Sequence, residues 1–383
     1  MAPKRAAEIF RTRNPQAEKF RVTLYESLAA TGKGHLTDVV INETYAPNPV
    51  EIIWKPEHKL PLHPNGMLFE ALDAMGRTND SWKVYSVGGG ALREEGTKRF
   101  SNSVYALTTL SEIMVICAHT QSSYWQYVEL SEGKGIWDFL ANVWRTMNDA
   151  IERGLAADGL LPGSLNLNRK AHSFLSEAGK HGTDFKQTAC LSAYAFAVAE
   201  ENAAGGVIVT APTCGACGIV PAIVRYMQEA RQLRTQTILQ ALATAGLIGS
   251  VVKTNGSISG AQVGCQGEVG TACAMGAAAA AQILGGSVHQ IEYAAEMGLE
   301  HHLGLTCDPV AGLVQIPCIE RNAHAATRAL SCAQMAIMSD GKHRIPFDDV
   351  VAVMKQTGTD LPSIYRETSI GGLAKIYQQN KKQ

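Results

Sequence analysis

The chain has 383 residues, of which 46% are apolar and 18% are charged, and it contains nine cysteines. This apolar fraction excludes a disordered segment, and so few cysteines in so long a chain exclude a small disulfide-stapled module. The 34 basic and 35 acidic residues leave a net charge of -1, so no global field attracts nucleic acid or anionic lipid. We therefore expect two domains, a small-molecule substrate recognised locally, and no nucleic-acid or membrane partner.

The first third of the chain mixes β-branched and aromatic runs with turn residues, which is typical of an α/β domain. Its pattern predicts strands at residues 20–25, 39–41, 51–54 and 81–85, and helices at residues 67–75 and 105–118. The stretch 121–135 is polar and then charged, and it predicts a linker.

From residue 136 onward, apolar residues recur at helical spacing and many are small, which predicts an all-α domain. Two stretches, 235–252 and 269–291, lack Lys, Arg, Asp and Glu but carry polar residues, so we expect buried core helices and no membrane spans. The predicted class is α+β, with one domain at 1–130 and a second at 131–383.

The cysteines fall into three groups by their surroundings. An odd count without an apolar signal segment predicts a reducing, cytoplasmic location. Four cysteines lie within helical apolar patterns and are expected in the core: Cys117, Cys190, Cys273 and Cys332. A C-x-x-C formed by Cys214 and Cys217 is compatible with zinc or a redox pair, but no second pair accompanies it.

The third group, Cys265, Cys307 and Cys318, lies in loops punctuated by glycine or proline. Glycine lets the backbone come close to a cluster and offer free N–H groups. Three thiolates without a fourth would leave one iron of a [4Fe-4S] cluster without a protein ligand, able to act as a Lewis acid on a substrate hydroxyl. From spacing alone, three cysteines also fit zinc.

Long motifs surround these loops and recur in the first third of the chain. They are EENAAGG (200–206), TAPTCGACGIVP (210–221), NGSISGAQVGCQGEVG (255–270), GLEHHLGLTCDPVAG (298–312), QIPCIERN (315–322), YRETS (365–369), LYESLAATGKGH (24–35), LPLHPNGM (60–67) and YSVGGG (85–90). With these motifs, nearly the whole chain strongly resembles the iron–sulfur L-serine dehydratases in their single-chain form.

The resemblance implies a homodimeric lyase that converts L-serine to pyruvate and ammonia. It implies an N-terminal β domain similar to the allosteric substrate-binding domain of some phosphoglycerate dehydrogenases, followed by an all-helical catalytic α domain. The family's cluster ligands fall on Cys265, Cys307 and Cys318. Its suspected base falls on His35, whose neutral imidazole suits abstraction of the Cα proton. The family's substrate-site positions fall on His63, Asn65 and Ser86.

One substrate contact is not assigned by the resemblance. The serine carboxylate needs a donor, and Lys33, two residues before the suspected base, or another nearby group is expected to hold it.

The sequence also departs from the family pattern. Relatives carry a Ser-Ser-Ser-His-Thr motif just before the stretch matched by residues 1–10, where this sequence starts. They often have asparagine at the position of Cys214, and many end in a cysteine, at the position of Gln379, that reaches the open iron. A glutamine amide is a poor iron ligand beside a thiolate, so we expect no such plug and mobile residues beyond Tyr377.

Two alternatives follow. The absence of the Ser-Ser-Ser-His-Thr motif from this sequence favours a first alternative, a catalytically impaired protein that binds an amino acid or a cluster. A PLP-dependent dehydratase would use Lys33 as Schiff base and residues 88–90 to hold phosphate, but it leaves the three loop cysteines unexplained.

Overall fold

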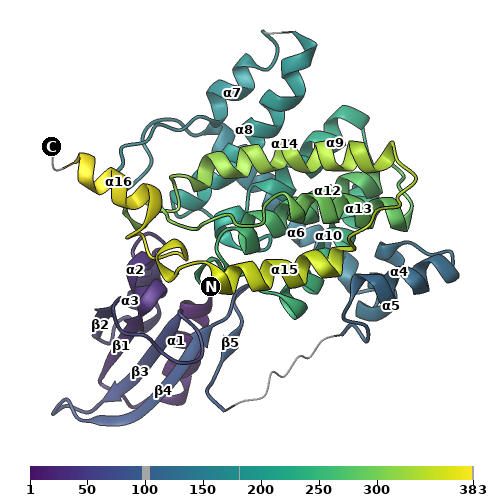
Figure 1. Ribbon diagram of the computed structural model, residues 1–383. Helices are drawn as coiled ribbons and strands as arrows, with labels where there is room; N and C mark the ends of the chain where they lie inside the picture. The colour runs from purple at the N-terminus through teal and green to yellow at the C-terminus, as the bar shows by residue number, and fades with distance from the viewer. Residues whose placement is uncertain (97–103, 181, 382–383) are drawn as a thin grey trace.

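The computed structural model describes residues 1–96, 104–180 and 182–381, and two parts of different architecture make it up. A small region of sheet and helices comes first in the chain, and a large helical region follows it (Figure 1). We call them the sheet region, residues 1–96, and the helical region, which starts at residue 104. This arrangement confirms the predicted α+β class.

The described strands of the sheet region form one five-stranded mixed sheet in the order β2-β1-β3-β4-β5. The strands are β1 (Lys19–Tyr25), β2 (Val50–Lys55), β3 (Gly66–Leu72), β4 (Thr78–Ser86) and β5 (Leu92–Arg93). Strand β1 pairs in parallel with β2, whereas the other neighbours pair antiparallel. The predicted strands at 20–25, 51–54 and 81–85 each lie inside an observed strand and are confirmed.

The sheet region also contains the helices α1 (Ala2–Arg13), α2 (Glu26–Thr31) and α3 (Thr37–Tyr45). Phe10 of α1 contacts Phe20 of β1 edge to face, with ring centroids 6.3 Å apart. Tyr45 of α3 stacks on the same Phe20 ring at 4.1 Å. Because side chains alternate between the two faces of a strand, both helices cover the same face of the sheet.

Two predictions for this region are wrong. Residues 39–41 lie in α3 and not in a strand, because Ile41 and Tyr45, four residues apart, are both buried on one helix face. Residues 67–75 form no helix, since Gly66–Leu72 is a strand paired with β1 on one side and β4 on the other. Helix formers such as Met67 and Glu70 adopt the strand because pairing on both edges outweighs their weak intrinsic preference.

The helical region consists of α-helices joined by loops and short helical turns. Its α-helices are α4 (Leu110–His119), α5 (Tyr124–Glu132), α6 (Ile136–Ala156), α7 (Ala171–Glu177), α8 (Thr183–Ala203), α9 (Ile219–Arg231), α10 (Thr235–Asn255), α11 (Gly260–Val263), α12 (Thr271–Ile283), α13 (Val288–Glu300), α14 (Cys318–Ile337), α15 (Phe347–Asp360) and α16 (Gly372–Asn380). The short helical turns are η1 (Cys214–Ala216), η2 (Gln266–Gly270), η3 (Val310–Gly312) and η4 (Ser363–Tyr365).

Helix α12 lies at the centre of the helical region and packs against α9, α10, α13 and α14. Its residues 271–281 are all buried, and most are alanine. A Cβ on Gly298 of α13 would lie 2.8 Å from the Cα of Ala274, so small residues allow this close approach. Helix α10 has the length and hydropathy of a membrane span, yet 67% of that stretch is buried inside the fold, as in a core helix. The prediction of a buried core helix is confirmed for residues 235–252. It is confirmed only in part for 269–291, because α12 ends at Ile283 and a partly exposed turn separates it from α13.

The predicted linker at 121–135 is wrong, because Tyr124–Glu132 form helix α5. Tyr124 is completely buried and donates a hydrogen bond of 3.1 Å to the Val288 carbonyl. The predicted helix 105–118 starts later, at Leu110, where Thr109 and Glu112 form a capping box. Helices α4 and α5 pack against α13, α15 and α10 of the helical region. The division of the chain at residue 130 stays a prediction.

The sheet and helical regions meet at turns whose backbones lie very close together. A Cβ on Gly34 would lie 1.9 Å from the carbonyl oxygen of Gly312 in η3, so no side chain fits at position 34. Ser27 of α2 donates a hydrogen bond of 2.9 Å to the carbonyl of Glu367. These contacts place the turn after α2, which carries His35, against the loops of the helical region.

The C-terminal residues form helix α16 at the outer edge of the molecule (Figure 1). The Asp308 carboxylate accepts a hydrogen bond of 2.5 Å from the Leu373 amide and anchors the start of this helix. The helix continues to Asn380, and the Lys381 ammonium lies 3.5 Å from the Ser164 carbonyl. The expectation of a mobile tail beyond Tyr377 is therefore corrected for residues 378–380, which include Gln379 and continue helix α16, while residues 382–383 lie outside the described part of the chain.

Candidate active site

The thiols of the three loop cysteines come from separate segments of the helical region. Cys265 immediately precedes η2, Cys307 lies in the loop after α13, and Cys318 is the first residue of α14. The sulfur atoms of Cys265 and Cys307 and a carboxylate oxygen of Glu268 all lie within 4.8 Å of one another. The structure thus brings two of the predicted ligands together with a carboxylate, and Cys318 lies near enough for the charge of Cys265 to affect it.

The backbone around Cys307 is held by the motif at 365–369. The Cys307 amide donates to the Tyr365 carbonyl at 2.8 Å, and the Glu367 amide donates to the Cys307 carbonyl at 2.5 Å. On the other side, Gly264 has a φ of 75°, and a Cβ there would lie 2.7 Å from the Leu305 carbonyl. Glycine is required at this position because of both its conformation and its close contact.

The acidic side chains of this cluster, Cys265, Cys307 and Glu268, lie close together in a buried place, and their pKa values are shifted. The hydrogen bond from Cys307 lowers the pKa of Cys265 to about 7, with help from Arg321 and against the effect of burial. The pKa of Cys307 is raised well above its usual value by that same bond and by burial. Burial, followed by the charges of Glu367 and Cys265, raises the pKa of Glu268 well above its usual value. In their ionised forms these groups would repel one another, and a bound cation would relieve the repulsion.

Space at the cluster is kept open by Gly260, the first residue of α11. A Cβ there would lie 2.4 Å from a Glu268 carboxylate oxygen and 3.1 Å from the Cys307 sulfur. Soft thiolate ligands suit iron–sulfur clusters and zinc. The residues present therefore fit a metal centre held by thiolates.

His35 of the sheet region faces the helical region at this point. Its Nδ1 lies 3.5 Å from the Cys214 sulfur, and its Nε2 lies 3.2 Å from a carboxylate oxygen of Glu367. Burial alone would lower the pKa of His35, but Cys214 and then Glu367 outweigh it and raise the pKa well above its usual value. Conversely, His35 outweighs burial and lowers the pKa of the Cys214 thiol. The three side chains form a chain of titratable groups across the boundary between the regions.

The C-x-x-C motif is divided between two environments. Cys214 starts η1 and is partly exposed, whereas Cys217 is completely buried beside the Val198 carbonyl at 3.8 Å. Burial raises the pKa of Cys217 well above its usual value. Only Cys214 of this pair therefore lies against the candidate site.

His63, Asn65 and Ser86 are linked to one another in the sheet region. The backbone amide of Asn65 donates to His63 Nδ1 at 3.1 Å, and the backbone amide of Ser86 donates to the backbone carbonyl of Asn65 at 2.9 Å. The His63 side chain is 5% exposed, and its Nε2 has no hydrogen-bond partner among the described residues. Burial lowers its pKa to about 4, with the charge of Glu367 opposing this shift. His63 is therefore a neutral imidazole with one unused nitrogen near Glu367.

Comparison with known proteins decides the family. The family model described as "Serine dehydratase alpha chain" matches residues 70–374, and the model described as "Serine dehydratase beta chain" matches residues 42–97. The chain belongs to the serine dehydratase family.

Individual relatives agree with this assignment. An L-serine dehydratase of Streptomyces coelicolor is 39% identical, over 98% of this chain and 94% of the relative. L-serine dehydratase 1 of Escherichia coli is 40% identical, over 92% and 88%. An L-serine dehydratase of Haemophilus influenzae is 39% identical, over 96% and 91%. This member of the serine dehydratase family therefore spans most of the length of these relatives.

Among the described residues of this serine dehydratase-family chain, Lys33 makes no hydrogen bond or ion pair with the other predicted site residues. Its side chain is exposed, and its ammonium lies 5.6 Å from the centroid of the Trp54 ring, in a cation–π contact.

Two further residues at the site, Glu367 and Glu268, were not predicted to have a functional role. Glu367 stands inside the motif YRETS, which was the only available signal. Glu268 stands three residues after Cys265 and accepts a hydrogen bond of 2.6 Å from Thr213. Their importance depends on contacts between distant segments of the chain.

Proposed function

We propose that this chain deaminates L-serine to pyruvate and ammonia with the help of a [4Fe-4S] cluster held by Cys265, Cys307 and Cys318. The observation that carries the proposal is the position of Glu367. Its carboxylate pairs with the His35 imidazole of the sheet region, and its backbone amide donates to the carbonyl of Cys307, one of the buried thiol residues of the helical region. The names of the relatives, L-serine dehydratases over nearly the full chain, support the substrate.

A cluster bound by three thiolates supplies one iron without a protein ligand, a Lewis acid for the serine hydroxyl. The chain's own contribution is to arrange the groups around it. Gly260 leaves room beside Cys307, and the hydrogen bond from Thr213 fixes the Glu268 carboxylate. The bonds between Cys307 and the 365–369 segment tie this centre to Glu367, and through Glu367 to His35.

His35 is the proposed base for the Cα proton of serine. The Glu367 carboxylate accepts a hydrogen bond from Nε2–H, which fixes the tautomer and leaves the Nδ1 lone pair free to take a proton. In the structure, Nδ1 faces the Cys214 sulfur. Serine must therefore displace the contact between Cys214 and His35, and the raised pKa of His35 must be overcome before the imidazole can act as a base.

His63 is proposed to donate a hydrogen bond to a substrate oxygen. Because its Nδ1 accepts from the Asn65 amide, its hydrogen resides on Nε2, the buried nitrogen that lacks a protein partner among the described residues. A neutral donor of this kind suits the serine carboxylate, with Ser86 beside it. Lys33 stays a predicted second donor.

The test is an anaerobic assay of the purified chain for pyruvate from L-serine, with iron and acid-labile sulfide measured on the same sample. We expect activity with about four irons and four sulfides per chain, as a [4Fe-4S] cluster requires. A cluster without pyruvate would favour the alternative of an impaired binding protein. Activity with PLP absorbance and no iron would favour the PLP-dependent alternative.

The proposal includes assembly and location. We propose a cytoplasmic homodimer, and gel filtration of the anaerobic protein with light scattering tests the dimer directly.

A further inference from the structure

A cavity of about 300 Å³ lies between the turn after α13 and one face of α14, apart from the thiols. Its charged or titratable lining residues are all basic: His301, His302, Arg321, His324 and Arg328. No aspartate or glutamate of the described chain lines it. Leu303, Leu305 and Val269 complete the wall. The cavity is therefore a basic pocket with an apolar floor.

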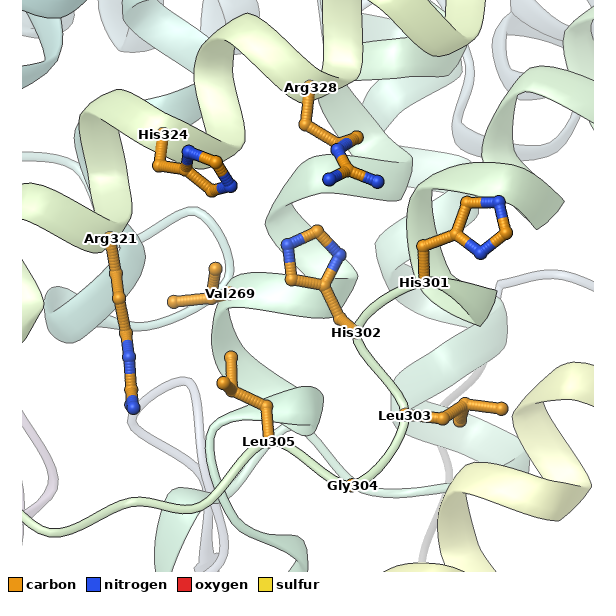
Figure 2. A pocket seen from close by; sticks show the side chains of 9 residues that line it. All are labelled: Val269, His301, His302, Leu303, Gly304, Leu305, Arg321, His324 and Arg328. Carbon is orange, nitrogen blue, oxygen red and sulfur yellow. The ribbon is translucent and has the colours of Figure 1, made fainter.

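Helix α14 sets the spacing of three of the basic side chains. Arg321, His324 and Arg328 stand at i, i+3 and i+7, so they share one face of the helix. His324 and Arg328 are one turn apart, a rise of about 6 Å, which a single small anion can bridge. Figure 2 shows these two side chains and His302 turned toward a common space, whereas Arg321 extends away from them.

Arg321 already has hydrogen-bonding partners within the protein. It donates to the Thr306 carbonyl at 2.7 Å, and its interaction with Cys265 contributes to raising its own pKa. Arg328, in contrast, has no ion-pair partner among the residues that the structure describes. A guanidinium is always charged and is partly buried here, and the acidic groups on which its charge acts are the thiols of Cys332 and Cys273, not a carboxylate of the described chain.

The pKa of His302 is also affected by the positive charge around the pocket. Its Nδ1–H donates to the Gly298 carbonyl at 2.7 Å, which leaves Nε2 available on the side of the cavity. Burial lowers the pKa of His302 to about 4, and among the nearby charges Arg328, His324 and His301 act in the same direction, against the hydrogen bond to Gly298. A negative charge in the pocket would reverse their effect.

We propose that this pocket binds a small multivalent oxyanion, of the phosphate or polycarboxylate type, held chiefly by Arg328 and His324. His302 becomes a further donor when it takes up a proton beside the bound anion. Two permanent guanidinium charges disfavour a metal ion here, and the one close group of three metal-ligand atoms in the described residues is that of Cys265, Glu268 and Cys307. The inference concerns binding alone and does not depend on the proposed reaction.

The experiment is calorimetric titration of the anaerobic holoenzyme with inorganic phosphate and, separately, with citrate, at constant ionic strength kept with chloride. We expect saturable binding of at least one of them, and the stronger of the two distinguishes a phosphate from a polycarboxylate ligand. Loss of a charged hydrogen bond should weaken that binding about tenfold or more in Arg328→Gln. His324→Gln, a change at an exposed position, should weaken it severalfold.

The matched control is Arg231→Gln, an exposed arginine at the end of α9, which should bind as the unmodified protein does. If Arg328→Gln fails to fold, His324→Gln decides the outcome. The proposal is wrong if neither anion saturates below about 10 mM, a dissociation constant corresponding to less than roughly 3 kcal/mol of binding. It is also wrong if both pocket variants bind as tightly as the control, or if they change the oligomeric state and leave anion binding intact.

Discussion

The sheet region and the helical region bring different chemistry to the surface where they meet. The sheet region contributes the imidazoles of His35 and His63, and the helical region contributes thiols and carboxylates. The two imidazoles respond in opposite ways: His35 has a raised pKa where it faces Cys214 and Glu367, whereas burial lowers the pKa of His63 to about 4. Groups of the helical region thus set the proton affinity of His35, whereas burial sets that of His63.

The largest effect should come from removing a thiol of the helical region. Cys307→Ser should abolish the brown chromophore and reduce serine turnover by more than about 100-fold, beyond the usual cost of losing an outer-shell partner. Cys190→Ser changes a thiol of α8 outside this group and should keep both properties. Absorbance and pyruvate formation are measured together under anaerobic conditions. A full cluster in Cys307→Ser would mean that this cysteine is not a ligand.

A methyl group tests the space that the helical region leaves open. In Gly260→Ala the new Cβ would overlap Glu268 and crowd Cys307, so we expect a loss of about 1–3 kcal/mol in unfolding free energy and a lower iron content. Gly246→Ala, on exposed α10 surface with no atom within 4 Å of its Cβ, should instead stabilise by about 0.5–1 kcal/mol. Equal iron content and stability in the two variants would show that the space beside Gly260 is not needed for metal binding.

The contact between Cys214 and His35 should control the pH dependence. A base acts when neutral, so a raised pKa places the rising limb of kcat/KM at high pH. Cys214→Asn removes the strongest interaction that raises the pKa of His35, so the limb should move to lower pH. On the acidic side of the limb, activity should rise about tenfold for every pH unit by which the limb moves. The control is Cys217→Ala, which leaves that contact in place. An unmoved limb in Cys214→Asn would contradict the assignment of His35 as the base.

The smallest effect concerns stability in acid. A folded pKa of about 4 for His63 lies below the usual 6.5, so the unfolded chain binds more protons between these values, and stability falls as pH drops through this range. This histidine should therefore account for a loss of about 2 kcal/mol between pH 7 and pH 5.

Urea unfolding at the two pH values measures this loss. His63→Gln should be less sensitive to acid than the unmodified protein, whereas His119→Gln, at an exposed position, should match it. Equal acid sensitivity in all three would show that His63 is not buried as a neutral group.

The sequence predicted the helical region better than the sheet region. Helical periodicity and the runs of small residues identified α10 and α12, because a buried helix imposes its pattern over several turns. Strand β3 was missed because its helix-forming residues become a strand only when β1 and β4 pair with it. Helix α5 was missed because its polar surface conceals the buried Tyr124.

At the site, the three loop cysteines could be identified from their glycine and proline flanks. The partner of His35 could not, because 332 residues separate it from Glu367 and no local pattern indicates such a contact. The unusual backbone of Glu367, with a φ of 57°, was likewise invisible in a motif without glycine at that position. Side chains that act across the boundary of the two regions require the assembled fold.

The most direct test of the central claim is the turnover of His35→Gln with its cluster intact. If an imidazole of the sheet region serves a metal centre of the helical region, this variant should keep its iron, sulfide and absorbance spectrum, while kcat falls by about 100-fold or more, as expected for loss of a general base. His172→Gln, which changes an exposed histidine of α7, should keep both. A full cluster with kcat within about twofold of the unmodified protein, a difference of less than roughly 0.5 kcal/mol in the barrier, would contradict the account.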